Sequence, residues 1–591
     1  MSIVKNLQKS TVESLTALFN QSFTEKDFQV NATKPEFEGD YTVVLFSLVK
    51  SLKLSPDAIG NQLGQRLITN HPDLFSAYNI IKGFLNLTVA DKYWMEVLQK
   101  NYNDVCFGKK AITDKKVMVE YSSPNTNKPL HLGHLRNNFL GWSVAEIYKA
   151  AGYNVIKTCI VNDRGIHICK SMIAWQLFAN GATPQSTNIK GDHFVGDYYV
   201  KFNDEYKIQI EKLKAEGLKQ EEAEKEAPIM KATQQMLLDW EAGKPEVMEL
   251  WQTMNSWVYA GFDTTYKTIG SDFDKTYYES NTYLLGKKTV EEGLQKHVFY
   301  KEADNSVWID LEKDGLDKKI VQRKDGTSVY MTQDIGLAMQ KYEEYKIDQS
   351  IYVIGDEQNY HMKVLKLICQ KLGLPYADDI YHLSYGMVEL PTGKMKSREG
   401  TVVDADDIVS EMEKVAQEKT EELGKVKDFT TEELKELYHT IGLGALKFFL
   451  LRVDPKKKMI FNPEESIDFH GFTGPFIQYN HARIKSLLRK NELMTNKDTG
   501  NDFLPLEKEL IVSLEQYPAI IQEACNEMNP SAIAIYIFNI AKTFSSFFAE
   551  HSVANAETAD KKQLRLQLAA MTANVIKSGM GLLGVNVPER M

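Results

Sequence analysis

Hydrophobic residues in the first third of the chain follow the pattern of a strand, a helix and a second strand. Residues 117–121 form a short β-prone run that prolines end, and residues 135–150 then have the length and spacing of a helix. A second β-prone run covers residues 155–161. Strands connected in this way pair in parallel through a right-handed crossover. The pattern therefore predicts one half of a doubly wound parallel sheet.

The second half of the sheet is predicted farther along the chain. Residues 350–354 form an apolar strand, residues 360–372 a helix and residues 381–390 another strand. Charged helical sequence occupies about residues 180–290, which we interpret as an insertion between the two halves. Residues 111–405 are thus expected to form one Rossmann-like α/β domain with a helical insertion.

Two further units flank this domain. Residues 1–110 mix amphipathic helical stretches with short strand-like runs such as residues 83–89, which predicts an N-terminal α+β domain. After about residue 405 the sequence is helical to its end, so residues 406–591 are expected to form a separate all-α domain. Three domains suit a chain of 591 residues, which is too long for a single hydrophobic core.

One loop of the first half-sheet carries a dense group of candidate phosphate ligands. It reads Glu-Tyr-Ser-Ser-Pro-Asn-Thr-Asn-Lys-Pro-Leu-His-Leu-Gly-His over residues 120–134 and leads into the predicted helix, whose N-terminal N–H groups and dipole favour anions. His131 and His134 share a face, Gly133 leaves room for a flat ring, and Lys128 adds a positive charge. The alternative is a helix-capping loop with incidental histidines.

A second basic loop follows the last predicted strand. Residues 391–398 read Pro-Thr-Gly-Lys-Met-Lys-Ser-Arg, which suits phosphate binding but is also compatible with an exposed basic turn. Together the two loops resemble the HIGH and KMSKS motifs of class I aminoacyl-tRNA synthetases, in the order found in that family. Residues 120–136 and 582–591 are similar to arginyl-tRNA synthetases in particular, so the resemblance covers nearly the whole chain.

The resemblance implies a two-step reaction. Arginine and ATP, the latter with Mg²⁺, would form arginyl-adenylate and diphosphate, and the arginyl group would then pass to tRNA(Arg). The substrate carboxylate attacks the α-phosphate directly, so the enzyme positions the reactants and stabilises charge. Two alternatives are a class I synthetase for another amino acid and a non-catalytic tRNA-binding paralogue.

The resemblance also assigns candidate residues for the adenylation step. The residues expected to act on the phosphates are Lys128, His131, His134 and Lys396. Those expected to bind ATP are His131, Gly133, His134, Lys394, Met395 and Lys396. The KMSKS pattern has a lysine at its fourth position, where this chain has Ser397, and the resemblance implies that Lys128 supplies the missing charge.

Specificity for arginine requires acceptors, because a guanidinium has five donors and no acceptor. The residues that the resemblance assigns to arginine are Glu120, Asn125, Tyr330, Asp334 and Gln358. Glu120 and Asn125 are expected at either the α-amino and carboxylate end or the guanidinium. Asp334 is also compatible with a role in capping its own helix.

The helix predicted around residues 476–488 carries the candidate tRNA ligands. One stripe contains Ile477, Ile484 and Leu488, and the other contains Phe476, Tyr479 and Arg483. Aromatic and guanidinium planes stack on single-stranded bases, although Phe476 and Tyr479 are also compatible with core packing. The resemblance places this helix in an anticodon-binding bundle and assigns tRNA binding to Gln478, Tyr479 and Arg483.

Composition bears on the partners of the protein and on the compartment in which it works. The formal charge of −10 means that an RNA partner would require a local basic track, and residues 452–490 contain one. The five cysteines include no Cys-x-x-Cys pair, which argues against a disulfide framework and a cysteine-rich zinc site. Neither an export signal nor a membrane span is expected, because polar residues interrupt the apolar run at 533–549. We therefore expect a cytoplasmic protein without a structural metal. A monomer is expected as well, although composition does not bear on the oligomeric state.

Overall fold

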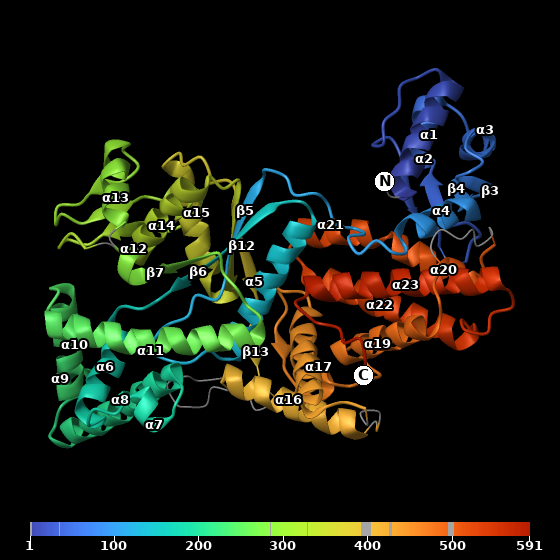
Figure 1. Ribbon diagram of the computed structural model, residues 1–591. Helices are drawn as coiled ribbons and strands as arrows, with labels where there is room; N and C mark the ends of the chain where they lie inside the picture. The colour runs from blue at the N-terminus through green and yellow to red at the C-terminus, as the bar shows by residue number, and fades with distance from the viewer. Residues whose placement is uncertain are drawn as a thin grey trace.

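A parallel sheet forms the centre of the computed structural model (Figure 1). The structure describes residues 3–34, 36–283, 285–327, 329–389, 391, 404–422, 424, 428–494 and 502–591. The sheet has the strand order β12-β11-β5-β6-β7, and all neighbouring strands are parallel. Its strands are β5 (Lys116–Glu120), β6 (Asn154–Val161), β7 (Lys275–Tyr278), β11 (Gln349–Gly355) and β12 (Ile380–Tyr385). The predicted doubly wound sheet is thus confirmed.

Helix α5 (Leu132–Ala150) connects β5 to β6 and is buried on nearly all sides. It packs on the sheet and also contacts helices of the C-terminal third. This position explains why its sequence lacks a strongly polar face. The other helices of the sheet domain are α6 (Ile166–Phe178), α14 (Tyr330–Tyr345) and α15 (Asn359–Lys371), the last preceded by the short turn η2 (Asp356–Gln358).

The helical insertion follows α6 and ends before β7. It consists of α7 (Pro184–Thr187), α8 (Gly191–Ala215), α9 (Gln220–Glu226), α10 (Pro228–Glu241) and α11 (Pro245–Ile269). The expected range of about 180–290 also takes in β7, a strand of four residues that pairs with β6. Such a short strand between helices leaves little periodic signal in the sequence.

A small antiparallel sheet separates β7 from α14 and was not predicted. It has the order β10-β9-β8 and is preceded by two short helices. The elements of this segment are α12 (Glu279–Thr282), α13 (Gly286–Gln295), β8 (Tyr300–Lys301), β9 (Val307–Ile309), η1 (Glu312–Asp314) and β10 (Lys319–Gln322). Their strands have two to four residues, which is below the length at which alternation is informative.

The N-terminal region contains an antiparallel sheet of order β1-β2-β4-β3 with helices packed against it. Its elements are α1 (Ile3–Phe19), β1 (Gln29–Ala32), β2 (Tyr41–Val44), α2 (Phe46–Leu52), α3 (Pro56–Asn70), β3 (Phe75–Ile81), β4 (Phe84–Val89) and α4 (Asp91–Asn101). Figure 1 shows this region, in blue, resting on the C-terminal helices. The amide of Ile3 donates to Oε1 of Glu515 at 2.7 Å, and Asn574 Nδ2 donates to the carbonyl of Tyr102 at 3.1 Å.

In the described residues of the C-terminal third the chain is helical, as predicted, apart from the two-residue strand β14 (Met459–Ile460), which pairs with β13 (Val388–Glu389). Its helices are α16 (Ala405–Glu422), α17 (Thr431–Leu451), α18 (Pro463–Ser466), α19 (Gly474–Lys490), α20 (Pro505–Glu515), α21 (Tyr517–Glu527), α22 (Pro530–Glu550) and α23 (Ala559–Leu582). Among the described residues, α22 is long and apolar enough to cross a membrane. It packs against α19, α20, α21 and α23, and one face is buried as in a core helix.

Candidate active site

Two histidines cap the N-terminus of α5. His131 is the N-cap residue, and its Nδ1 accepts a hydrogen bond from the amide of Gly133 at 3.1 Å. His134 reaches back, and its Nδ1 accepts from the amide of His131 at 3.1 Å. The ring centroids are 3.9 Å apart. A Cβ on Gly133 would lie 3.0 Å from Cε1 of His131, so the glycine allows the close ring packing.

Both histidines are neutral at pH 7. Burial lowers the pKa of His131 to about 3, and the nearby Lys128 charge contributes to the decrease. Burial also places the pKa of His134 well below its ordinary value. Because each Nδ1 accepts a backbone N–H, the ring proton of each neutral imidazole belongs on Nε2. The pair can therefore donate two hydrogen bonds to phosphate oxygens without adding charge.

The chain between β5 and α5 is held in a strained backbone conformation. Ser122 and Ser123 have φ values of 79° and 44°, a region that residues other than glycine rarely adopt. The first turns of α5 fix this conformation: Asn137 Oδ1 accepts from the Ser122 amide at 2.6 Å, and Asn138 Nδ2 donates to Ser122 Oγ at 3.1 Å. The helix thus orients the loop that leads to the two histidines.

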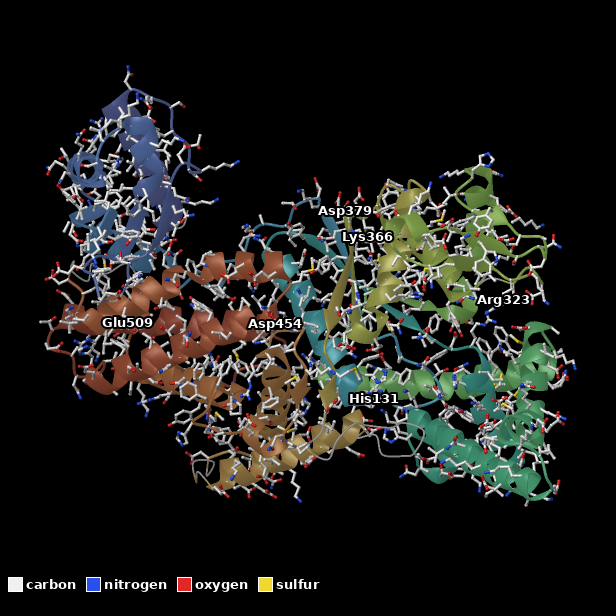
Figure 2. The ribbon with its side chains drawn as sticks, turned by 180° about the vertical axis from the view of Figure 1, so that it is seen from behind. His131, Arg323, Lys366, Asp379, Asp454 and Glu509 are labelled. Atoms are coloured by element: carbon white, nitrogen blue, oxygen red, sulfur yellow. The ribbon has the colours of Figure 1, made fainter. Side chains whose placement is uncertain are left out.

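The structure describes the candidate phosphate ligands of the first loop but not those of the second. Lys128 lies close enough to both histidines for its charge to lower each pKa. Figure 2 shows His131 near the middle of the molecule, at one end of α5. The candidates Lys394, Met395 and Lys396 lie outside the described residues.

Glu120, expected to bind arginine, forms an ion pair in the structure. Its Oε2 accepts a hydrogen bond from Nζ of Lys341, and the side chains are only 6% and 1% exposed. Burial alone would lower the pKa of Lys341, but the Glu120 carboxylate and Tyr352 raise it above its ordinary value. The lysine therefore stays charged. Asn125, the other candidate from this loop, is exposed, and its backbone bridges to Asn162 after β6.

The remaining arginine candidates lie on α14 and just before α15. Asp334 Oδ2 is 2.7 Å from Nε2 of His361. The N-cap residue of α14 is Val329, so Asp334 does not cap its own helix. Tyr330 is 69% exposed at the start of α14, and Gln358 is exposed in η2. The contact with His361 connects Asp334 of α14 to α15, and Gln358 lies in the turn just before α15.

Glu279, a further charged residue after a strand of this sheet, was missed by the sequence reasoning. Burial raises the pKa of Glu279 to about 7; the Arg164 guanidinium opposes this effect, whereas Asp163 and Asp334 add to it. Asp163 is buried and accepts from Tyr259 OH at 2.8 Å and from Ser280 Oγ at 2.7 Å. Glu279 comes directly after β7, and Asp163 comes shortly after β6, where ligands of parallel sheets bind. Recognising β7 would have indicated Glu279.

The tRNA candidates of α19 fall into two environments. Tyr479 and Arg483 help to line a cavity of about 430 Å³, and the Arg483 guanidinium lies 4.1 Å from the ring centroid of Phe548. Gln478 is fully buried and donates to the carbonyls of Thr440 at 3.0 Å and Asn586 at 2.8 Å. Gln478 thus differs from the expectation of an RNA contact, because it connects α19 to α17 and the C-terminal segment. The cavity also contains Arg489, Lys490, Arg590 and Met591.

One group of side chains has the spacing of a metal site. Among the described residues, Asp192, His193 and Asp406 bring their ligand atoms within 4.8 Å of one another. The ammonium group of Lys190 already lies in this group, 2.6 Å from Asp406 Oδ2 and 3.2 Å from Asp192 Oδ2. A lysine in this position supplies the positive charge that a cation would provide.

Comparison with known families accounts for most of the chain. The family described as "tRNA synthetases class I (R), catalytic domain" matches residues 96–462. "Arginyl tRNA synthetase N terminal domain" matches residues 5–89, and "DALR anticodon binding domain" matches residues 477–591.

Relatives match over their full length. The arginine–tRNA ligase of Flavobacterium psychrophilum is 52% identical, and that of Bacteroides thetaiotaomicron is 50% identical, with 100% of each chain covered in both cases. The solved structure of Thermus thermophilus arginyl-tRNA synthetase is similar in fold, with a TM-score of 0.78 and 23% identity over 99% of this chain and 100% of that chain. The chain therefore belongs to the class I arginyl-tRNA synthetases, the family of arginine–tRNA ligases.

Proposed function

We propose that His131, His134 and Lys128 bind the ATP phosphates while arginine is converted to its adenylate. The observation that carries the proposal is the pair of neutral imidazoles at the N-terminus of α5. Two Nε2–H donors and the positive end of the helix dipole stabilise the charge that develops as diphosphate leaves. ATP is proposed to bind as its Mg²⁺ complex, and the family resemblance also assigns Lys394 and Lys396, which lie outside the described residues, to ATP binding.

Arginine is proposed to bind where β5, β6 and β7 end. Asp334 and Glu279 are the carboxylates that accept from the guanidinium, and Tyr330, Asn125 and Gln358 are the polar residues around it. The raised pKa of Glu279 supports this arrangement, because burial disfavours the ionised carboxylate, Asp163 and Asp334 add to the effect, and the Arg164 guanidinium offsets it only in part. A bound guanidinium corrects that imbalance. Glu120 is proposed to support the arginine site indirectly, through its ion pair with Lys341.

The tRNA is proposed to contact three domains that correspond to residues 1–110, 111–405 and 406–591. In the last of these, Tyr479 and Arg483 bind anticodon bases, because an aromatic ring and a guanidinium beside a basic cavity suit stacking on unpaired bases. The enzyme is proposed to act as a monomer in the cytoplasm. The described cysteines are unpaired, which fits a reducing compartment.

ATP–diphosphate exchange tests the proposal most directly. The purified enzyme should catalyse exchange with arginine but with none of the other nineteen standard amino acids. We expect the exchange to require tRNA(Arg), as the family resemblance implies. Exchange with a different amino acid would indicate another class I specificity. Absence of exchange with every amino acid, despite binding of tRNA, would indicate a non-catalytic paralogue.

A further inference from the structure

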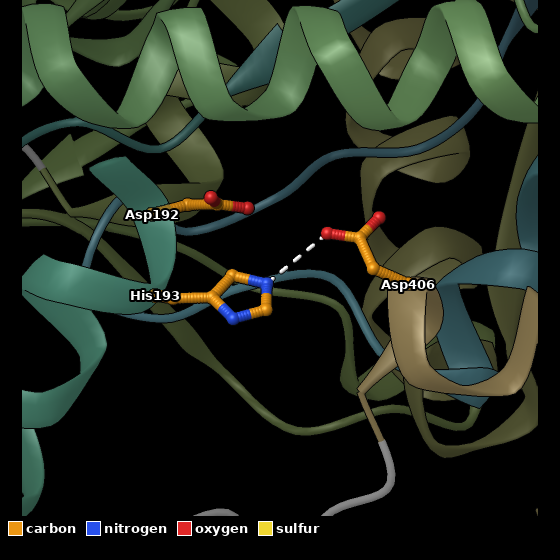
Figure 3. A group of neighbouring side chains, drawn as sticks. All are labelled: Asp192, His193 and Asp406. Carbon is orange, nitrogen blue, oxygen red and sulfur yellow. Dashed lines mark hydrogen bonds and ion pairs between the residues drawn. The ribbon is translucent and has the colours of Figure 1, made fainter. Parts of the chain in front are cut away.

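A cluster of charged side chains connects the helical insertion to the start of α16. Lys190 and His193 lie at the beginning of α8, and Asp404 and Asp406 lie at the beginning of α16. Figure 3 shows His193 beside Asp406. His193 Nε2 lies 3.1 Å from Asp406 Oδ2 and 3.3 Å from Asp404 Oδ2. Lys190 Nζ donates to Asp406 Oδ2 at 2.6 Å, and Thr265 Oγ1 of α11 donates to Asp406 Oδ1 at 2.9 Å. Both oxygens of Asp406 therefore have donors from the insertion.

The cluster is charged at neutral pH. The neighbouring carboxylates of Asp404 and Asp406 raise the pKa of His193 to about 10. Burial would raise the pKa of Asp406, but hydrogen bonds from His193 and Lys190 bring it below its ordinary value. Lys190 and His193 thus face Asp404 and Asp406 across the junction between α8 and α16, and Lys190 also pairs with Asp192 of its own helix at 3.2 Å. Removing either cation would leave neighbouring carboxylates to repel each other.

Asp404 carries this connection to the phosphate site. Its backbone forms an antiparallel bridge with His131, and the amide of Ala405 donates to the carbonyl of Leu130 at 3.0 Å. The Asp404 side chain also accepts from the Asp406 amide at 2.7 Å, which fixes the first turn of α16. The backbone that positions the His131 ring is therefore paired with the segment that the cluster holds.

The same helix of the insertion supports the chain on the other side of His131. At Gly196 of α8, a Cβ would lie 2.8 Å from Cδ of Pro129 and 3.6 Å from Cα of Lys128. Helix α8 thus packs directly on the turn that carries Lys128. It contacts the phosphate loop before His131 and, through the cluster, the segment paired with His131.

We propose that Lys190 and His193 are positioning residues for adenylate formation. They hold Asp404 and Asp406 in place, and this fixes the His131 backbone and the orientation of its Nε2–H donor. The inference rests on the proposed role of His131 at the ATP phosphates. By this proposal the helical insertion contributes to adenylate formation by positioning His131, and neither Lys190 nor His193 is proposed to contact ATP.

Hydrogen–deuterium exchange tests the connection without relying on activity. Amides of residues 404–408 and 130–134 should exchange roughly tenfold faster in His193→Ala than in the parent enzyme, because local opening no longer separates paired charges. His439→Ala is the matched control, since His439 Nδ1 also lies close to a carboxylate of α16, 2.6 Å from Oε1 of Glu413, on a different part of that helix. Unchanged exchange in His193→Ala would overturn the proposal.

Steady-state kinetics of ATP–diphosphate exchange, with tRNA present, test the consequence. His193→Ala should lower turnover or raise the ATP KM by on the order of 10-fold to 100-fold, as misplacement of a catalytic group does, while the arginine KM stays within about twofold. His193→Gln, which keeps a donor, should recover much of the loss, and His439→Ala should behave like the parent.

The outcomes separate this inference from the proposed function. Parent-like kinetics of His193→Ala would overturn the positioning role, as would a kinetic loss without faster amide exchange. An equal loss of arginine and ATP affinity with a lowered melting temperature would show a purely structural role and overturn it too. A parent enzyme that shows no arginine-dependent exchange would contradict the proposed function instead, and the amide exchange would still decide whether the cluster holds the His131 backbone.

Discussion

Lys341 and Glu120 form an ion pair at the centre of the parallel sheet domain, although 221 residues separate them in the chain. Both side chains are nearly inaccessible to solvent, and the ammonium group also lies 4.7 Å from the ring centroid of Tyr352. A buried pair of this kind leaves an uncompensated charge when one partner is removed. The pair therefore determines how Glu120 contributes to the site.

Lys341→Met should destabilise the catalytic domain, because it leaves the Glu120 carboxylate buried without its partner. The expected loss is about 3–5 kcal/mol, and the double variant Lys341→Met/Glu120→Gln should recover most of it. Urea denaturation of the three proteins measures this. If Glu120→Gln alone raised the arginine KM without lowering stability, Glu120 would instead be a direct arginine ligand.

Glu279 predicts a pH dependence of arginine binding. Its pKa in the free enzyme is about 7, and a bound guanidinium favours the ionised carboxylate, so binding should release a proton below pH 7. The arginine KM should therefore rise as the pH falls from about 7.5 to 6, by up to roughly tenfold per pH unit.

Glu279→Gln provides the comparison for this dependence. The variant should bind arginine weakly at every pH and should lose most of the change between pH 6 and 7.5. A parallel pH dependence in the parent and the variant would assign the titration to another group. The KM for ATP, measured in the same assays, serves as the internal control.

Lys447 predicts a pH dependence of stability. Burial lowers its pKa from 10.5 to about 8, and its Nζ donates to the carbonyl of Gly584 at 2.8 Å. Between these two values the unfolded chain binds more protons than the folded chain, so stability increases as the pH rises through that range. Below about pH 8 the buried charge opposes folding.

Lys447→Met should accordingly be more stable than the parent at pH 7, by about 1–3 kcal/mol, and the difference should shrink towards pH 10. Thermal denaturation of the two proteins at pH 7 and pH 9.5 measures the difference and its change. A variant that is less stable at both pH values would mean that the bond to Gly584 outweighs the cost of burying the charge.

Neighbouring residues of α19 should respond differently to substitution. Tyr479→Ala and Arg483→Ala should each weaken tRNA binding by about 1–3 kcal/mol, the usual effect of losing a stacking contact with a base, and should leave the fold intact. Gln478→Ala should lower the melting temperature instead, because Gln478 is buried between two carbonyl acceptors. Filter binding of tRNA and thermal denaturation distinguish the two effects. A large loss of stability in Tyr479→Ala would return that residue to the hydrophobic core.

The sequence predicted the sheet because its central strands are continuous apolar runs that leave a strong local signal. It could not predict the partner of Glu120, since nothing local links residue 120 to a lysine of α14. The outcome for Gln478 has a different cause. Helical periodicity separates a buried stripe from an exposed one, but it does not show that a polar residue beside the stripe will be buried against backbone carbonyls of another helix and the C-terminal segment.

The sequence predicted that His131 and His134 share a face at the start of a helix, which is a local property, and their role at the phosphates stays a prediction. Glu279 was missed because the strand before it has only four residues. The cluster around His193 was missed for a related reason: its members come from positions that are distant in the chain, and a charged helical insertion resembles a solvated surface. Local chemistry was therefore predictable, whereas pairing between distant segments was not.

Lys128 is expected to compensate for the departure of this chain from the KMSKS pattern. Ser397 stands where that pattern has a lysine, and Lys396 is shifted by one position. Lys128 lies close enough to the two histidines to lower the pKa of both, so its charge acts at the proposed phosphate site. We expect Lys128→Ala to reduce the exchange rate by about 10²–10³, the usual effect of removing one preorganised donor, with the arginine KM nearly unchanged. Lys396→Ala should have a smaller effect.

In addition, loss of the Lys128 charge should raise the pKa of His131, which NMR titration can follow independently of catalysis. The opposite result, with Lys396→Ala severely impaired and Lys128→Ala nearly normal, would contradict this prediction. Lys396 would then supply the positive charge of the second motif from a position shifted by one residue, and Lys128 would act only on the pKa of the histidines.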